Sequence, residues 1–295
     1  DLGKLGDAYF MVMEYIHGVS GAELLTQAVR TDGALEYGAA ITIVSQIALA
    51  LDHGYRVKDL NDHPMGVIHH DVSPHNLQIG YDGSVKLLDY GVATQSGRKS
   101  ARGRRGKYAY MTPEAIRKLS PDHRSDLFSL GVVLYEFTVG RRLFKAETTQ
   151  ETMSRIQKGQ VPKPSDFKPD YPPLLEAVVM QALRVDPDER FQSGRQLVEA
   201  LEDVSRNHNL ITGNKALSSY MRGLYYQEME VRQAELASLI DRLDDESGIN
   251  WTSSHLINGT SELTALSETP QRKTADRPVE PTDGVAEPAG RETIE

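Results

Sequence analysis

The chain of 295 residues contains no cysteine, which excludes disulfide bonds, thiolate catalysis and zinc sites with cysteine ligands. This absence fits a reducing compartment, so we expect a cytoplasmic protein. Long apolar runs are also lacking. The longest one, Leu127 to Val139, is interrupted by Ser129 and Glu136 and is too short to cross a bilayer. We therefore expect no membrane span.

Basic residues are the minority among the charged ones. The chain has 33 Lys and Arg residues against 42 Asp and Glu residues, for a net charge of -9. Nonspecific attraction to nucleic acid or to an anionic membrane is therefore not expected. The N-terminus has neither an initiator methionine nor a signal pattern, so we expect it to be a cut edge rather than a processed leader.

The spacing of apolar residues predicts a mainly helical protein with few strands, of the α+β class. A short apolar run at Tyr9–Tyr15 predicts a strand, and helical spacing over Tyr37–Tyr55 predicts a long helix with one buried face. The run Leu127–Val139 is apolar nearly all round, as in a central buried helix. Further helices are expected over residues 151–158, 174–183 and 196–204.

The composition divides the chain into three parts. The mainly helical domain is expected to occupy residues 1–206. Residues 207–244 are rich in Glu, Arg, Leu and Met at helical spacing, which predicts an amphipathic helical extension that could bind a partner. Ser, Thr, Pro, Glu and Gly dominate residues 245–295, which predicts a disordered tail.

Three oxygen-bearing side chains flank a predicted hairpin. Short strands at residues 77–79 and 85–88 are joined through Asp82-Gly83, a dipeptide suited to a tight turn. Asp71 and Asn76 precede this hairpin, and Asp89 follows it. Phosphoryl transfer needs such groups: Asp71 to orient an attacking hydroxyl, and Asn76 and Asp89 to bind magnesium through oxygen.

A metal site of another kind is an alternative for the same segment. Imidazole and carboxylate groups are good zinc ligands, and four of them lie close together in the sequence. This alternative explains none of the motifs downstream. Its ligands would be His69, His70, Asp71 and His75.

The order of the motifs resembles that of a bacterial serine/threonine protein kinase. The family's catalytic loop is matched by His69-His70-Asp71 through Asn76, and its metal-binding triplet by Asp89-Tyr90-Gly91. The end of its activation segment is matched by Thr112-Pro113-Glu114. The resemblance implies that Asp126 braces the catalytic loop and that Arg190 pairs with Glu114. It also implies ATP and Mg²⁺ as cofactors and a kinase-like large lobe.

The resemblance extends upstream to a remnant small-lobe strand and a hinge at residues 10–15. A buried strand is the simpler interpretation of this run taken alone. The resemblance implies contacts with adenine or ribose from five residues, with Gln78 standing where the family usually has an apolar side chain. These residues are Met13, Glu14, Ile16, Ser20 and Gln78.

Three departures from the family pattern bear on activity. No glycine-rich loop, strand lysine or paired helix glutamate precedes Met13, so we expect an N-terminally truncated fragment that binds ATP poorly and is inactive by itself. Ser73 stands where the family usually has a lysine, and Lys107 where it usually has a threonine. Lys107 would then supply the missing charge, or is simply a surface lysine. His75 replaces a glutamate of arginine-directed kinases, so no basic substrate motif is expected.

The sequence thus predicts a kinase that transfers the γ-phosphoryl group of ATP to Ser or Thr hydroxyls of a protein substrate. One alternative is a catalytically silent pseudokinase that serves as a scaffold. Another is a small-molecule phosphotransferase of kinase-like fold, which the activation-segment motif and Arg190 disfavour.

Overall fold

The structure, a computed structural model, describes residues 2–63, 65–90 and 107–247. The expected α+β class with a predominance of helix is confirmed, since the described residues form two small sheets and many helices. The predicted helices are all present, and their ends differ from the predicted ones by a few residues. They are α2 (Tyr37–Arg56), α4 (His123–Val139), α5 (Thr149–Gln157), α6 (Pro173–Ala182), α7 (Gly194–Asn207) and α8 (Asn214–Ser247).

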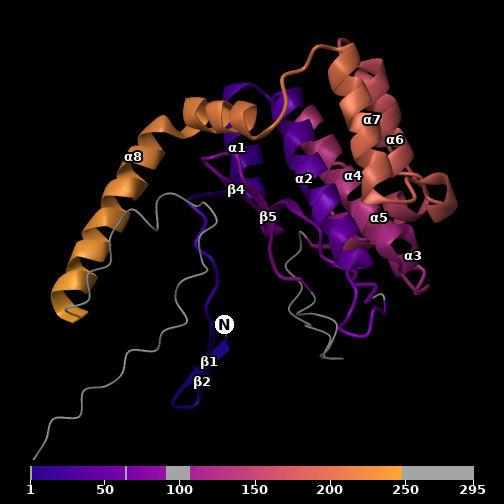
Figure 1. Ribbon diagram of the computed structural model, residues 1–295. Coiled ribbons are helices and arrows are strands. Elements are labelled where there is room, and N and C mark those ends of the chain that lie inside the picture. Colours follow the sequence, from indigo (N-terminus) through magenta and orange to yellow (C-terminus); the bar gives the residue numbers. More distant parts are fainter. Residues whose placement is uncertain (1, 64, 91–106, 248–295) are drawn as a thin grey trace, which may run out of the picture. The chain divides into compact units, whose positions relative to one another are not determined.

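The core is built around α2 and α4. Figure 1 shows α2, α4, α6 and α7 side by side, and contacts join α2 to α4 and α7, and α6 to α4 and α7. Residues 125–139 of α4 are buried on every side, as its continuous apolar sequence predicts. α4 begins at the N-cap Asp122 and ends at Gly140, which adopts the left-handed conformation that glycine favours. The central helix therefore supports the elements that carry the polar motifs.

Two short sheets hold the strands. β1 (Leu2–Leu5) and β2 (Ala8–Met11) form an antiparallel hairpin. The other sheet has the order β3-β4-β5, with β3 (Gly18–Ser20), β4 (Leu77–Gly80) and β5 (Val85–Leu87), all antiparallel. The predicted hairpin at Asp82-Gly83 is confirmed: Gly83 has a φ of 84°, and the Asp82 carboxylate accepts the N–H of Ser84.

The strand predicted over Tyr9–Tyr15 is shorter in the structure. β2 ends at Met11 because its partner β1 has only four residues in the described part of the chain, so no ladder bonds remain beyond that point. The sequence analysis also missed α1 (Gly21–Thr31). Its N-terminus has a capping box, in which the Ser20 hydroxyl accepts the N–H of Glu23 and the Glu23 carboxylate accepts the N–H of Ser20.

Short helical turns connect the longer elements. In the part of the chain that the structure describes, four of them are 3₁₀ turns, and α3 is a single helical turn of four residues. They are η1 (Pro74–Asn76), η2 (Lys107–Tyr110), α3 (Pro113–Ile116), η3 (Pro164–Asp166) and η4 (Pro187–Glu189).

The long helix α8 spans most of the predicted extension and changes direction at Tyr225, whose φ and ψ are not helical. Before this kink, Leu217 and Met221 are fully buried, and the Ser218 hydroxyl donates to the carbonyl of Tyr81. After it, Arg232 donates to the carbonyl of Gly18 at 2.8 Å, and most of the side chains described over residues 226–239 are exposed, although Met229 packs against the core. Partner binding by this extension stays a prediction, and the predicted tail lies almost wholly outside the described residues.

Membrane crossing was not expected from the sequence. Within the described ranges, no helix combines the length and the apolar content that a span would need.

Candidate active site

The carboxylate of Asp126 fixes the backbone of the loop that carries Asp71. Asp126 lies in the first turn of α4 and is 3% exposed. It accepts the N–H of His69 at 2.7 Å and the N–H of His70 at 2.8 Å. Burial raises the pKa of Asp126, and the two N–H donors oppose part of that rise. His70 has a φ of 63°, which turns the chain so that consecutive N–H groups reach one carboxylate.

The buried imidazole of His69 joins this loop to the end of β5. Its Nδ1 lies 3.2 Å from the backbone nitrogen of Asp71, and its Nε2 lies 2.8 Å from the carbonyl oxygen of Leu88. Because the N–H of Asp71 must donate to Nδ1, the proton of the neutral ring resides on Nε2 and is donated to Leu88. The ring also packs edge-on against Tyr90, at 4.9 Å between centroids. His69 therefore links the residues before and after the hairpin.

Asn76 is held in a fixed orientation next to Asp71. Its amide nitrogen donates to the carbonyl of Asp71 at 2.7 Å, and its backbone N–H donates to the carbonyl of Ser73 at 3.0 Å across η1. The carbonyl of Asn76 in turn accepts the N–H of Leu88 at 2.8 Å. These bonds bring Asp71, Asn76 and the residue preceding Asp89 into one network. With its nitrogen committed to Asp71, the amide presents its oxygen for binding a cation.

Asp89 follows this network immediately and is exposed. Its φ of 64° is left-handed, a conformation that aspartate tolerates better than most side chains and that is frequent at functional sites. An amide oxygen from Asn76 and a carboxylate from Asp89 are hard oxygen donors, which fit magnesium with phosphate oxygens and water as its other ligands.

The zinc alternative finds no support. In the part of the chain that the structure describes, which includes all four candidate ligands, no three His, Cys, Asp or Glu side chains are placed to hold a metal ion. Both ring nitrogens of His69 are also engaged in hydrogen bonds.

Two of the five residues predicted to contact the nucleotide, Ser20 and Gln78, are neighbours in one row of the β3-β4-β5 sheet. Ser20 of β3 pairs with Gln78 of β4, and Gln78 pairs with Lys86 of β5. Lys86 forms an exposed ion pair with Glu14 at 3.2 Å, which places the segment after β2 at the same sheet. The Ser20 hydroxyl is at the same time the cap of α1. Its predicted role at a ribose stays a prediction.

The other two residues that were predicted to contact adenine are Met13 and Ile16. Met13 is 63% exposed, and Ile16 is partly buried. Their roles at adenine likewise stay predictions.

A buried ion pair anchors the segment around Thr112-Pro113-Glu114. The guanidinium of Arg190 donates to both carboxylate oxygens of Glu114, at 2.9 Å and 2.8 Å, and the Ser125 hydroxyl donates to the same carboxylate at 2.6 Å. Burial alone would raise the pKa of Glu114, but Arg190 and Ser125 outweigh it, so that pKa is lowered. Arg190 also donates to the carbonyls of Arg184, Val185 and Arg124. Its charge is thus fully satisfied.

Part of the predicted site lies outside the described residues. Gly91 falls in the interval 91–106, and the side chain of Lys107, at the start of η2, is not described either. Ser73, the residue that Lys107 was predicted to compensate, is 8% exposed and immediately precedes η1. The exchange of charge between these two positions stays a prediction.

One further buried carboxylate was not assigned a role by the sequence analysis. Glu136 of α4 is fully buried, accepts the Tyr110 hydroxyl at 2.7 Å and pairs with Arg142 at 3.0 Å. Burial raises the pKa of Glu136 and that of Tyr110. The signal was present, since Glu136 is the one acidic residue within the apolar run 127–139, but its partners cannot be read from local spacing.

Comparisons with known proteins agree with this geometry. The family described as "Protein kinase domain" matches residues 3–202. The chain is 29% identical over 242 residues to the tyrosine-protein kinase MasK of Myxococcus xanthus, covering 81% of this chain and 38% of that protein. It is 33% identical over 198 residues to the serine/threonine-protein kinase PknB of Mycolicibacterium smegmatis, covering 65% of this chain and 30% of that protein.

A solved structure shows the same similarity. The crystal structure of the Mycobacterium tuberculosis PknI kinase domain aligns with a TM-score of 0.51 and 25% identity, covering 69% of each chain. The chain spans well under half the length of the two curated relatives above.

Proposed function

The chain belongs to the protein kinase family and has that family's fold, and from this premise we propose that it transfers the γ-phosphoryl group of ATP to a serine or threonine hydroxyl of a protein. The observation that carries the proposal is the hydrogen-bond network that joins Asp126, His69, Asp71, Asn76 and Leu88. The network supports the proposal because it holds Asp71, the proposed base, and Asn76, one proposed cation ligand, and ends next to Asp89, the other.

The chain's own residues divide the work of this reaction. The Asp71 carboxylate would accept the proton of the attacking hydroxyl, held in place through the contacts of its backbone with His69 and Asn76. Asn76 and Asp89 would hold magnesium, which when bound neutralises charge on the phosphate oxygens. Asp126 touches none of the reacting atoms and acts as a positioning residue.

The proposal is tested in the full gene product that carries this chain. Asp71→Asn should retain magnesium-dependent nucleotide binding and lose phosphoryl transfer by at least about 100-fold, because it removes a general base. Asp89→Asn should weaken nucleotide binding only when magnesium is present. Asp170→Asn changes an exposed aspartate outside these motifs, is the matched control and should change neither property.

Two outcomes would count against this assignment. Full transfer by Asp71→Asn would remove the proposed base. Magnesium-dependent nucleotide binding without any transfer by the unmodified protein would favour the silent scaffold instead.

Tyrosine specificity is the second candidate, because the relative MasK is named a tyrosine-protein kinase. We favour serine and threonine because several relatives, among them PknB and the Bacillus subtilis protein PrkC, are named serine/threonine-protein kinases. Phosphoamino-acid analysis of labelled protein substrate separates the two candidates. Label on tyrosine alone would overturn the serine/threonine proposal.

A further inference from the structure

A cavity of about 760 Å³ lies beside the segment that precedes Thr112-Pro113-Glu114. Ala109 of η2 forms one wall, and the loop between α4 and α5 forms another with Arg142, Lys145 and Glu147. Threonine side chains at the start of α5 complete the lining. The mechanism described above uses none of these residues.

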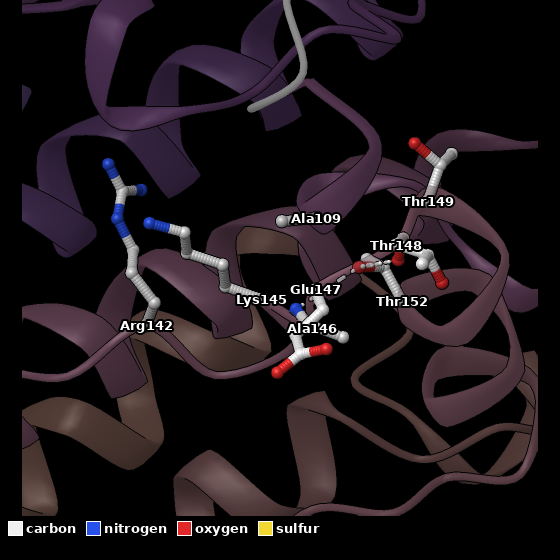
Figure 2. Close-up of a pocket in the computed structure, with 8 residues that line it drawn as sticks. All are labelled: Ala109, Arg142, Lys145, Ala146, Glu147, Thr148, Thr149 and Thr152. Atoms are coloured by element: carbon white, nitrogen blue, oxygen red, sulfur yellow. Dashed lines mark hydrogen bonds between the residues drawn. The ribbon is translucent and has the colours of Figure 1, made fainter.

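The charged groups of this cavity are arranged asymmetrically. Figure 2 shows the guanidinium of Arg142 and the ammonium of Lys145 pointing the same way, while the carboxylate of Glu147 points away from both. Among the described residues, no carboxylate forms an ion pair with Lys145. One edge of the cavity therefore presents the Lys145 ammonium, which has no ion pair among the described residues, beside the Arg142 guanidinium, which is paired with Glu136.

Arg142 is fixed in this position by buried groups. Its Nη1 donates to the carboxylate of Glu136 at 3.0 Å and contacts the hydroxyl of Tyr110. Both contacts use the same nitrogen, so the other donors of the guanidinium fork are directed elsewhere. The Arg142 side chain is 39% exposed. Because Glu136 and Tyr110 already hold it, binding of an anion would cost little side-chain entropy.

The residues that hold the Asp71 loop and Arg142 lie on one helix, and their separation sets the scale of the distance from Asp71 to the cavity. Asp126, which holds the Asp71 loop, and Glu136, which holds Arg142, are ten positions apart in α4. At 1.5 Å of rise per residue this separation is about 15 Å. An extended peptide spans about 3.3 Å per residue, so about five residues cover the distance.

We propose that this cavity binds an acidic side chain of the protein substrate, located within about five residues of the phosphorylated hydroxyl. The ligand chemistry is a carboxylate or a phosphoryl group, which the Lys145 ammonium and the remaining N–H donors of Arg142 favour over neutral or basic residues. The inference rests on the proposed transfer to protein, and it deepens that function by naming the substrate class.

The test measures binding and transfer separately in the full gene product. Fluorescent peptides carry one acceptor serine and, at each of the five positions on either side in turn, glutamine, glutamate or phosphoserine. At low salt, the glutamate or phosphoserine peptide should bind about three- to tenfold more tightly than its glutamine counterpart at one or more positions. Tighter binding of the phosphoserine peptide than of the glutamate peptide identifies a phosphoryl group as the ligand. Equal affinity for these two peptides shows that the cavity accepts either anion.

Charge variants assign the preference to the cavity. Lys145→Glu should abolish or invert the preference for the acidic peptide. Lys158→Glu is the matched control, since it makes the same change on an exposed lysine at the far end of α5 and should leave the preference intact. Arg142→Gln is made together with Glu136→Gln, so that no buried carboxylate is left without its partner, and its thermal unfolding is checked before binding.

The outcomes separate this inference from the proposed function. Equal binding and equal transfer for acidic and neutral peptides at all positions would overturn the inference and leave the kinase assignment standing. A preference in binding that Lys145→Glu removes, with no transfer to any peptide, would uphold the acidic-residue site and refute the transfer reaction. Loss of the preference in Lys158→Glu as well would place the effect outside the cavity and overturn the inference.

Discussion

Two regions of the molecule differ in which side chains they bury: the region around α4 buries charged groups, and the N-terminal hairpin of β1 and β2 exposes apolar ones. Around α4, the charged groups Glu114, Asp126, Glu136 and Arg190 are buried, and each has hydrogen-bond partners. In the hairpin the apolar side chains are exposed, including Leu5 at 78% and Tyr9 at 72%. The region around α4, including the loop at the candidate site, is held by buried charges whose hydrogen bonds are satisfied, whereas the hairpin's apolar residues contribute little to stability within the described residues.

The largest expected effect comes from breaking the most buried ion pair. Arg190→Met should lower the free energy of unfolding by about 3–5 kcal/mol, because it leaves the Glu114 carboxylate buried without its partner. Urea unfolding measures this change. Arg184→Met is the control: its pair with Glu189 is exposed and 4.0 Å long, so about 0–1 kcal/mol is expected. The double variant Glu114→Gln with Arg190→Met should recover part of this lost stability. If Arg190→Met and Arg184→Met lowered the free energy of unfolding equally, the buried pair would not stabilise the protein more than the exposed one.

A pair of glycine substitutions probes packing in the two regions. Gly140 and Gly6 both have positive φ, at 77° and 60°. A Cβ at Gly140 would lie 1.8 Å from the carbonyl oxygen of Gly33, whereas nothing lies within 4 Å of one at Gly6. Gly140→Ala should therefore cost at least about 2 kcal/mol more than Gly6→Ala in urea unfolding, since only Gly140 adds a backbone clash to the strain of a positive φ. Equal losses would show that the hairpin turn is as constrained as the end of α4.

An aromatic truncation in the hairpin sharpens the same contrast. Phe10→Ala should change the free energy of unfolding by no more than about 0.5 kcal/mol, because Phe10 is 47% exposed. Phe167→Ala is the matched control, with 41% exposure but with Arg141 stacked on its ring at 4.7 Å. It should cost about 0.5–1 kcal/mol more. A loss above about 2 kcal/mol for Phe10→Ala would mean that the hairpin is packed against other residues in solution.

The smallest effect is expected at His17, which lies between the hairpin and α4 in the sequence. Burial, and then the charge of Arg232, lower the pKa of His17 below its ordinary value of 6.5. The unfolded chain therefore binds more protons than the folded one just below pH 6.5, so stability should fall as the pH is lowered through that window. His17→Gln should reduce the loss between pH 7.5 and pH 5.5 by at most about 0.5 kcal/mol, since the ring is only partly buried. An identical pH profile in both proteins would show that His17 titrates normally.

Local patterns in the sequence were sufficient for the elements whose bonds span a few residues. The helical spacing of Tyr37–Tyr55 predicted α2, the apolar run Leu127–Val139 predicted α4, and Asp82-Gly83 predicted the β4–β5 turn. The α1 helix was missed although its capping pair Ser20 and Glu23 is a local signal. The ends of strands were harder to predict, because β2 stops where its partner strand stops.

The identity and order of the candidate catalytic residues were also contained in the sequence. Asp71, Asn76 and Asp89 occur at the spacing that phosphoryl transfer by this family requires, and their residue types specify oxygen ligands for magnesium. The family resemblance already implied that Asp126 braces the loop that carries Asp71, but only the tertiary structure decided which atoms form the bonds and which further groups take part. Asp126 bonds to a loop 56 and 57 residues away, and Arg232 bonds to Gly18 across 214 residues. The physical reason is that helices and turns depend on hydrogen bonds between near neighbours, whereas buried charges are satisfied by whichever partners the packed fold brings within about 3 Å.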